Sequence, residues 1–383
     1  MNVDTDRERL IALRRDLHAH PELGYQEQRT SDIVAQFLQQ LDIEVHRGIG
    51  KTGVVGILKK GQSDRMIGLR ADMDALPMQD NGTTAWKSRV EGVCHACGHD
   101  GHTVMLLGAA EQLARHTDFD GSVCFIFQPA EEGLAGAKAM IDDALFSRFP
   151  CEAIYAIHNW PELPLGEVQT RPGAIMAAAD RFDITVKGGG GHAAQPHLTR
   201  DTLLAASELV VQLNTLVARA LDPCEPGLLT VTRIQGGFSH NMIPAEASIT
   251  GTVRTFSPAA QDVLESRLRH TAKHVTAAHG LEVEVSYLRY YPATVNSEAE
   301  AHFALNALKQ AGFKAGIARQ PALTSEDFAF MLQARAGAYL WLGSAPSKPL
   351  HHCAYDFNDA LIPHGVNAFA ALVRQALGEK FPC

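Results

Sequence analysis

Apolar residues recur at helical spacing near the start of the chain. Leu10, Leu13 and Leu17 form one such series, and the stretch 33–41 contains a second. Apolar side chains three and four residues apart lie on one face of a helix. The pattern therefore predicts that two amphipathic helices open the chain.

Short apolar runs then alternate with helical patterns. Strands are predicted at 53–60, 66–73, 122–128 and 153–159, and helices at about 101–116 and 134–146. Buried strands that alternate with helices are typical of a largely parallel sheet covered by helices on both faces. This part of the chain is predicted to be an α/β domain.

The pattern changes at about residue 181. The predicted elements are then a strand, a helix, two strands, a helix and a strand, at 181–187, 201–219, 228–236, 246–255, 259–279 and 281–290. This order is that of a ferredoxin-like unit, a four-stranded antiparallel sheet with two helices on one side. After Pro292 the α/β pattern returns, with elements at 297–311, 338–344 and about 363–378.

We therefore predict an α/β protein whose largely parallel-sheet domain is interrupted by an inserted ferredoxin-like α+β domain. The predicted boundaries are 1–180 and 292–383 for the larger domain and 181–291 for the insertion. A chain of 383 residues is long enough to form more than one core. An insertion of this kind is tolerated where its two junctions lie close together on a surface.

Composition narrows the classes of partner. The chain has 34 Lys and Arg against 43 Asp and Glu, a formal net charge of −9, so a general nucleic-acid binder is disfavoured. We find no apolar window long enough for a membrane span and no signal-type start, which predicts a cytoplasmic protein without a membrane partner. The seven cysteines are odd in number and scattered, so we expect them to be reduced.

The densest chemical signal is the stretch Cys94 to His102. It holds five metal-competent side chains and one carboxylate within nine residues, at a predicted helix start. Thiolate and imidazole groups at short spacing suit a borderline-soft divalent ion. The alternative is a polar loop of solvated histidines with a buried thiol.

A pair of adjacent carboxylates, Glu131 and Glu132, follows the predicted strand 122–128. Open α/β sheets bind ligands at that edge, where one carboxylate can coordinate a metal while the other handles a proton. Two glutamates after a strand can equally mark a solvated helix start.

Other strand ends also carry metal-type residues. His158 ends one predicted strand, the His351 and His352 pair follows another, and Asp72 and Asp74 follow a third. A buried core histidine is an alternative for His158. Because four strand ends show the same kind of residue, we predict a metal site at this edge of the sheet.

The inserted domain supplies further polar groups. A glycine run at 188–191 precedes His192 and formally satisfies a dinucleotide-binding fingerprint, but Pro196 interrupts the expected helix. A glycine-lined approach that lets His192 reach a neighbouring surface is the better interpretation. Asn241 and Arg254 are candidates for a substrate carboxylate, with turn chemistry and a solvated cation as the alternatives.

Taken together, these motifs resemble those of the two-metal amidohydrolases that include hippurate hydrolase, N-acyl-amino-acid amidohydrolase and plant auxin-conjugate hydrolase, relatives of aminoacylase and carboxypeptidase G. The motifs that carry the resemblance lie at 15–23, 70–77, 95–102, 128–133, 191–194, 325–328 and 350–351. The resemblance implies that Glu131 is the catalytic base. It implies five metal ligands: Cys97, His99, Glu132, His158 and His351.

The resemblance also implies that the inserted domain serves as a dimerisation or lid domain and that His192 reaches a partner's active site. The stretch Asp72 to Asp74 replaces the His-x-Asp of carboxypeptidase-type relatives, which implies the hippurate-hydrolase branch with Cys97 as substitute ligand and Asp74 in a supporting role. Cys353 stands where the family usually has proline, so either His351 or His352 is the last ligand.

The sequence hypothesis is thus a metal-dependent amidohydrolase that splits the linear amide of N-acyl-amino acids into a carboxylate and a free amino acid. Two divalent ions are expected, with zinc, manganese, cobalt and nickel all compatible. A homodimer or higher homo-oligomer is expected. Two rival hypotheses are a metal-independent amidase with Cys97 as nucleophile and a non-catalytic protein that binds acyl-amino acids.

Overall fold

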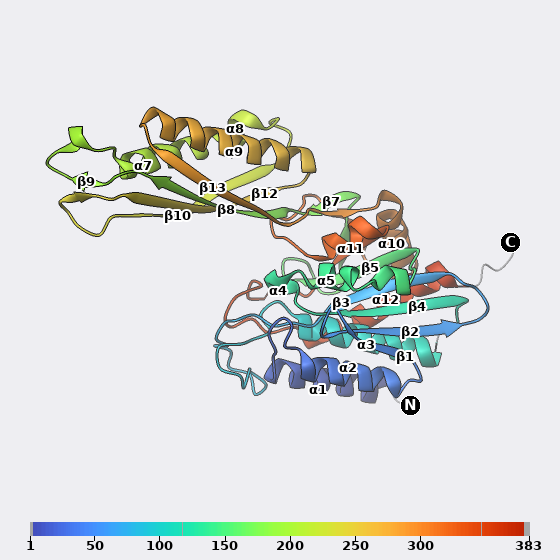
Figure 1. The fold of residues 1–383 in the computed structure, drawn as a ribbon. Coiled ribbons are helices and arrows are strands. Elements are labelled where there is room, and N and C mark those ends of the chain that lie inside the picture. The colour runs from blue at the N-terminus through green and yellow to red at the C-terminus, as the bar shows by residue number, and fades with distance from the viewer. Residues whose placement is uncertain (1–2, 117, 346, 379–383) are drawn as a thin grey trace. The chain divides into compact units, whose positions relative to one another are not determined.

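The computed structural model describes residues 3–116, 118–345 and 347–378 (Figure 1). The chain divides into two compact units. The first comprises Met1–Ile175, Val295–Gln320 and Asp327–Cys383, and the second comprises Met176–Thr294 and Pro321–Glu326. The second unit therefore interrupts the first in sequence. Its predicted role as a dimerisation or lid domain stays a prediction.

The first unit is built on an eight-stranded sheet with the strand order β1-β2-β4-β3-β5-β16-β6-β15. The strands are β1 (Glu44–Ile49), β2 (Gly53–Lys60), β3 (Met66–Asp72), β4 (Gly121–Gln128), β5 (Ala153–Trp160), β6 (Val168–Thr170), β15 (Ala315–Ile317) and β16 (Gly337–Gly343). Neighbours among β4, β3, β5 and β16 pair in parallel, whereas β1, β2 and β6 join antiparallel. The predicted α/β class with a largely parallel sheet is confirmed.

Three long helices of the first unit pack around a fourth, α3 (His99–His116). They are α1 (Val3–Ala19), α2 (Gln28–Gln39) and α12 (Ile362–Leu377). In Figure 1, α1 and α2 lie below α3. A Cβ built on Gly365 of α12 would stand 2.0 Å from the sulfur of Met105 in α3, so the close approach of these helices requires glycine there. Helices α10 (Glu298–Gln310) and α11 (Phe328–Ala334) also belong to this unit.

The prediction of a single helix at 134–146 is wrong. The structure has three short helices instead, α4 (Glu131–Leu134), α5 (Gly136–Asp142) and α6 (Leu145–Arg148). Ala135 and Ala144 between them have left-handed backbones, with φ of 55° and 62°. A left-handed residue ends a right-handed helix, and alanine gives no sequence signal for it.

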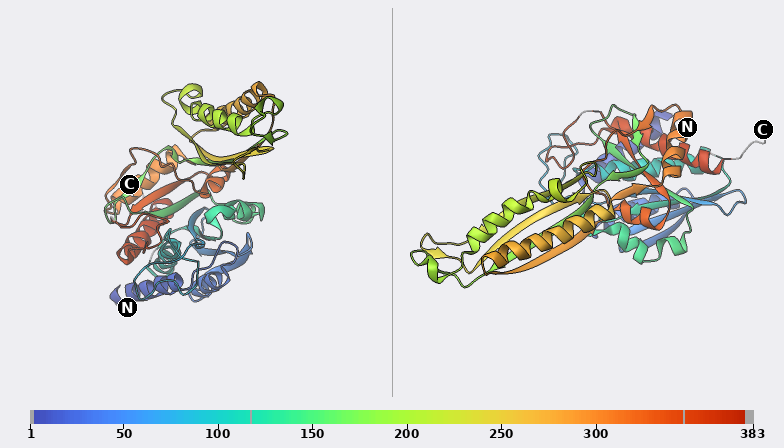
Figure 2. Two further views of the ribbon diagram at one scale, coloured as in Figure 1. Left: turned by 90° about the vertical axis from the view of Figure 1, so that its left-hand side faces the viewer. Right: turned by 90° about the horizontal axis from the view of Figure 1, so that it is seen from above.

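The second unit has the predicted ferredoxin-like order. Its elements are β8 (Ala178–Lys187), α7 (Thr202–Leu213), α8 (Leu216–Ala220), β10 (Gly227–Gly236), β12 (Glu246–Thr255), α9 (Pro258–Ala278) and β13 (Glu282–Tyr291). The sheet order is β10-β12-β8-β13, with every pairing antiparallel. The right-hand view of Figure 2 shows α7 and α9 running side by side over this sheet. The helix predicted at 201–219 breaks after Leu213 into α7 and α8.

Short strands complete the two units. They are β7 (Gly173–Met176), β9 (Gly191–His192), β11 (Met242–Ile243) and β14 (Thr294–Asn296). Among the helices that the structure describes, none has both the length and the apolar character needed to cross a membrane. The six described cysteines are unpaired, and Cys383 lies outside the described residues.

A buried charge network fixes α1 against the start of α3. His18 is 2% exposed, and its Nδ1 lies 2.8 Å from Asp100 Oδ2 while its Nε2 lies 3.7 Å from Asp80 Oδ2. Arg14 forms ion pairs with Asp100, Asp356 and Asp359. Burial lowers the pKa of His18, but Asp100 and Asp80 outweigh burial and raise it to about 9.

The raised pKa of His18 predicts a pH-dependent contribution to stability. The charged imidazole stabilises the fold fully below its unfolded pKa of about 6.5, and this contribution is lost as the pH rises through about 9. A shift of this size corresponds to about 3 kcal/mol. Urea unfolding of wild type and His18→Gln is expected to show a gap at pH 6 that shrinks by pH 9.5. A gap that stays constant with pH would contradict the assignment.

Candidate active site

Parallel strands of the first unit bring their carboxyl ends to one edge of the sheet, and polar residues follow them there. Asp72 ends β3, Glu131 lies just beyond β4, and His158 lies near the end of β5. The segment after β16 carries His351. Ligands bind at this edge in open α/β sheets.

A tight turn before α3 brings two more donors to this edge. Gly98 has a φ of +94°, and a Cβ built on it would stand 2.3 Å from Asn159 Oδ1. Glycine is therefore required between Cys97 and His99. The turn places their side chains in the same cluster, where both are buried.

The donor atoms form two sets that share one thiol. Cys97, His99 and His158 offer atoms within 4.8 Å of one another, and so do Cys97, Glu132 and His351. Cys97 Sγ lies 3.4 Å from His158 Nε2, and His351 Nε2 lies 3.2 Å from Glu132 Oε1. These five residues are the ligands that the resemblance implied, and each set has the size of a site for one ion.

Two features of the cluster fit bound cations. The Nε2 atom of His99 is buried and has no hydrogen-bond partner among the described residues, which is costly unless a further group binds it. Hydrogen bonds with Cys97 and Glu132 raise the pKa of His351 to about 10, so the surroundings of this ring favour a positive charge. A mixed set of thiolate, imidazole and carboxylate suits divalent ions of the zinc type.

Glu131 lies beside these sets. Its side chain is 7% exposed, and it groups with His99 and Glu132 within 4.8 Å. Its Oε1 accepts a hydrogen bond of 3.3 Å from the backbone N–H of Asp327. The adjacent carboxylates thus differ in surroundings, because only Glu132 belongs to the set with Cys97 and His351.

Asp74 links two members of the cluster. Its Oδ1 lies 3.2 Å from Nδ1 of His99, and its Oδ2 accepts a 2.8 Å hydrogen bond from the backbone N–H of Glu132. A carboxylate that bonds the second nitrogen of a ligating histidine fixes the tautomer and the direction of the ring. The position of Asp74 suits the supporting role expected from the sequence.

The comparisons with known proteins agree with this geometry. The sequence pattern of peptidase family M20/M25/M40 matches residues 68–375. The chain belongs to this family. Hippurate hydrolase of Campylobacter jejuni is 39% identical over 95% of this chain and 96% of its own length, and N-acetylcysteine deacetylase of Bacillus subtilis is 36% identical over the same shares. A solved M20 structure from Bacillus subtilis, described as a dinuclear metal-binding peptidase, has a TM-score of 0.86 at 33% identity and covers 98% of this chain and 99% of its own.

The sequence did not predict the group of polar side chains that lies beside the donors of this M20 site. His102 Nδ1 lies 2.6 Å from Asp72 Oδ1, and its Nε2 lies 2.5 Å from Asn159 Oδ1. His102 also groups with Asp72 and His99. The signal was the three-residue spacing of His99 and His102, which places both on one face of α3.

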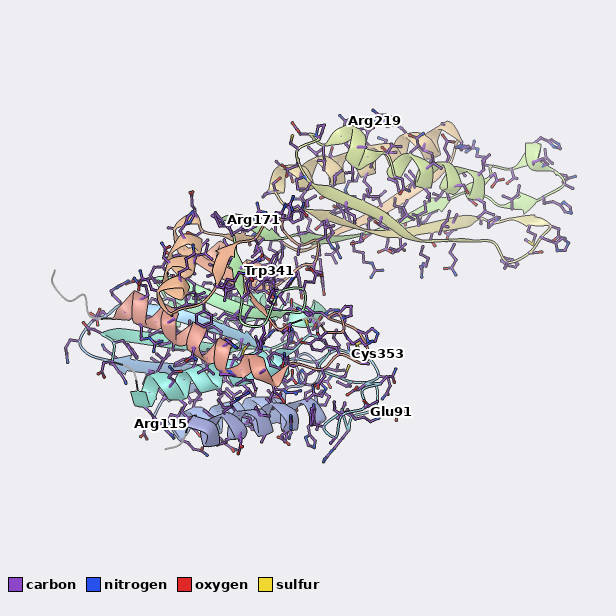
Figure 3. The ribbon with its side chains drawn as sticks, turned by 180° about the vertical axis from the view of Figure 1, so that it is seen from behind. Glu91, Arg115, Arg171, Arg219, Trp341 and Cys353 are labelled. Atoms are coloured by element: carbon purple, nitrogen blue, oxygen red, sulfur yellow. The ribbon has the colours of Figure 1, made fainter. Side chains whose placement is uncertain are left out.

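The structure separates the two candidate histidines after β16. His351 has a φ of 61°, donates its backbone N–H to Ala96 O at 2.8 Å and belongs to the set with Glu132. His352 is exposed, and its Nδ1 accepts a hydrogen bond from Ala354 N. Cys353, labelled in Figure 3, follows on the same loop. His351 is therefore the better candidate for the last ligand.

The remaining predicted residues belong to the second unit. His192 of β9 pairs with Met242 of β11, and the backbone N–H of Ala193 donates to Asn241 O at 3.0 Å, so His192 and Asn241 share one tip. Arg254 lies near the far end of β12, about 25 Å along the strand from Glu246. Its guanidinium donates to Thr252 Oγ1. The structure thus brings His192 and Asn241 together but leaves Arg254 apart from both.

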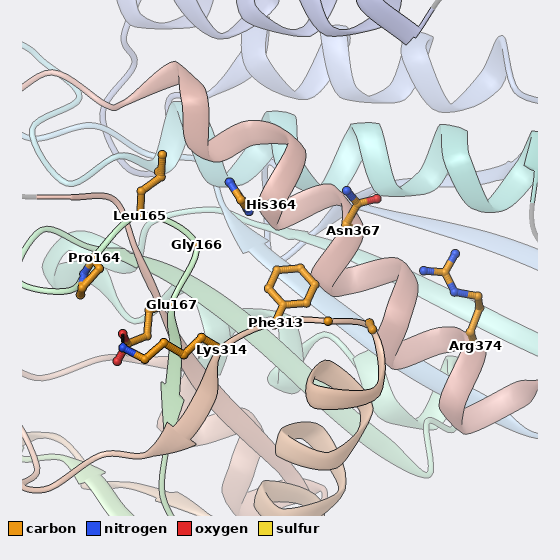
Figure 4. Close-up of a pocket in the computed structure, with 11 residues that line it drawn as sticks. Pro164, Leu165, Gly166, Glu167, Phe313, Lys314, His364, Asn367 and Arg374 are labelled. Carbon is orange, nitrogen blue, oxygen red and sulfur yellow. Dashed lines mark ion pairs between the residues drawn. The ribbon is translucent and has the colours of Figure 1, made fainter.

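The first unit also has a cavity of about 500 Å³ that none of these donors lines (Figure 4). Residues after β5, residues after α10 and the side chains of His364, Asn367 and Arg374 in α12 surround it. Glu167 and Lys314 form an ion pair within its wall. The residues that line this cavity are therefore different from those of the donor cluster.

Proposed function

We propose that this chain is a metal-dependent amidohydrolase that cleaves N-acyl-amino acids into a carboxylate and a free amino acid. The observation that carries the proposal is the placement of Glu131 beside two donor sets that share Cys97. Relatives named hippurate hydrolase, N-acetylcysteine deacetylase and IAA-amino acid hydrolase support this substrate class. The proposed ions are two divalent metals, with zinc, manganese, cobalt and nickel as candidates.

The residues of the chain divide the work of the reaction. When bound, divalent ions lower the pKa of water from 15.7 toward about 7. Glu131 accepts the proton of the attacking water and returns it to the leaving amine. Asp74 holds His99 and the backbone of Glu132 in place. Asn241 and Arg254 are candidates for the substrate carboxylate, because amide and guanidinium groups donate to carboxylates. Since Arg254 lies apart from the tip that holds Asn241, the two residues of one chain do not bind the same carboxylate together.

The test is a panel of N-acyl-amino acids assayed for release of the free amino acid. Hippurate, N-acetylcysteine and an indoleacetyl-amino acid represent the substrates named for the three relatives. An ester of the same acyl group tests whether hydrolysis requires an amide bond. Release of amino acid from at least one amide supports the proposal. Tight binding of these compounds without product would instead favour the non-catalytic binding protein.

The surroundings of Cys97 disfavour the metal-independent rival. Its thiol is buried, and burial raises its pKa, so little thiolate is available for attack. The same sulfur belongs to both donor sets. A shared ligand is a more consistent role for Cys97 than a nucleophile.

We further propose that the protein is a cytoplasmic homodimer formed through the second unit. Strand β10 is an edge of its sheet, and Leu204 and Val211 of α7 are 57% and 65% exposed on one helix face. An edge strand beside an exposed apolar stripe is suited to pairing with a second copy. Unpaired cysteines agree with a reducing compartment.

A subunit-mixing experiment tests whether His192 acts in the partner's active site. Glu131→Gln and His192→Ala are each expected to be nearly inactive, the latter with normal metal content. A mixture refolded together is expected to recover about a quarter of wild-type activity, because half of the dimers are mixed and each of these has one intact site. A mixture as inactive as its components would place His192 in its own subunit's site, whereas a fully active His192→Ala protein would place it outside the reaction.

A further inference from the structure

The segment between α1 and α2 packs against the strand ends that carry the donors. The backbone N–H of Ala75, next to Asp74, donates to Glu22 O at 2.9 Å. A Cβ built on Gly24 would stand 3.0 Å from the Cα of Ala130. This segment includes part of the 15–23 motif, to which no donor of the proposed site belongs. Its contacts reach Ala130, the residue directly before the two adjacent carboxylates.

Glu27 makes the most specific of these contacts. It is fully buried at the N-cap position of α2, yet its side chain makes no capping hydrogen bond to its own helix. Its Oε1 accepts a 2.8 Å hydrogen bond from the backbone N–H of Ala130, and its Oε2 accepts a 2.6 Å hydrogen bond from Thr52 Oγ1. Burying a carboxylate is unfavourable unless it is hydrogen-bonded, and here both oxygens are used on other segments.

The partner of Glu27 has an unusual backbone. Ala130 is fully buried and left-handed, with a φ of 54° and a ψ of 43°. This conformation is unfavourable for alanine, so the surrounding contacts must hold it. Glu131 and Glu132 follow directly, and the direction of both side chains depends on the backbone at Ala130. The hydrogen bond that Ala130 donates to Glu27 is therefore one residue away from the proposed base.

We propose that Glu27 is a positioning residue of the reaction: it holds Ala130 in the left-handed conformation and thereby directs Glu131 to the water and Glu132 to the metal. This inference rests on the proposed function of Glu131 and adds a residue that lies outside the donor cluster. Among the described residues, the side-chain hydrogen bonds of Glu27 are with Ala130 and Thr52, and Ala130 is the one that adjoins the two carboxylates.

Three substitutions separate hydrogen bonding from charge and from size. Glu27→Met keeps the volume but leaves Ala130 N–H unpaired, and it is expected to lower kcat at least tenfold while KM changes less than about threefold. Glu27→Gln keeps an acceptor oxygen and is expected to stay within about threefold of wild type. Glu27→Asp keeps the charge but shortens the side chain, so an intermediate kcat is expected even if the methionine variant does not fold.

Metal binding gives a readout that does not depend on turnover. In a calorimetric titration of the stripped protein with Mn²⁺, Glu27→Met is expected to bind one of two ions about tenfold more weakly, because Glu132 is misdirected. Glu111→Met is the matched control, since Glu111 is a buried carboxylate of α3 that pairs with Arg9 and Arg115. Its melting temperature is expected to fall while its kcat and Mn²⁺ affinity stay at wild-type values.

Two results would overturn the inference. One is a Glu27→Met protein with lowered melting temperature but unchanged kcat and Mn²⁺ affinity, which would make Glu27 a purely structural residue. The other is a Glu27→Gln protein as defective as Glu27→Met, which would exclude the hydrogen bond as the cause. If wild type hydrolyses no acyl-amino acid, the proposed function fails, and the Mn²⁺ titration still decides the role of Glu27.

Discussion

Glu131→Gln is expected to lower kcat by about two orders of magnitude or more while both metal ions stay bound. The reason is that glutamine keeps the size of the side chain and can still accept the 3.3 Å hydrogen bond from Asp327 N, but it cannot take a proton from water. Glu131 is not a member of either donor set that contains Cys97, so its charge is not needed to hold those ions. Two quantities are measured for each protein: kcat with N-acyl-amino acids, and metal content by mass spectrometry.

The neighbouring carboxylate provides the control for this prediction. Glu132 groups with Cys97 and His351, so Glu132→Gln is expected to lose metal as well as activity. The two substitutions change the same chemical group one residue apart, and only their surroundings differ. Equal loss of metal in both variants, or a Glu131→Gln enzyme of normal kcat, would remove Glu131 from the role of base.

The long helices and strands could be predicted because the pattern of apolar residues in each agrees with its burial in the structure. Strand β4 is buried at every position and appears as a continuous apolar run, as expected for a central parallel strand. Strand β1 was missed because its burial is irregular at the edge of the sheet. The breaks at Ala135 and Ala144 were missed because left-handed alanine depends on tertiary contacts rather than on local sequence.

The residues proposed as metal ligands stand out in the sequence, whereas most of the side chains that support them do not. Cys97 and His99 lie in a dense motif, and His158 and Glu132 lie at strand ends, so residue type and position were both informative. Glu27 and Asn159 are single polar residues whose partners are distant in sequence, at Ala130 and His102. No local pattern marks such a residue, because its role arises only when the chain folds.

Removal of the metal ions is expected to abolish hydrolysis, and return of a divalent ion to the stripped protein is expected to restore it. Without the ions, Glu131 has no water acidic enough to deprotonate at neutral pH, and the buried His99 Nε2 has no hydrogen-bond partner among the residues that the structure describes. The measurement is turnover after phenanthroline treatment and after reconstitution with zinc, manganese, cobalt or nickel, with His352→Ala as a control that binds metal normally because its side chain is exposed. A fully stripped protein that retains its rate, and loses it only on alkylation of thiols, would contradict the metal mechanism and favour the rival in which Cys97 is the nucleophile. Restoration by one ion at a lower concentration than the others would identify the preferred metal, which the mixed thiolate, imidazole and carboxylate ligands leave open.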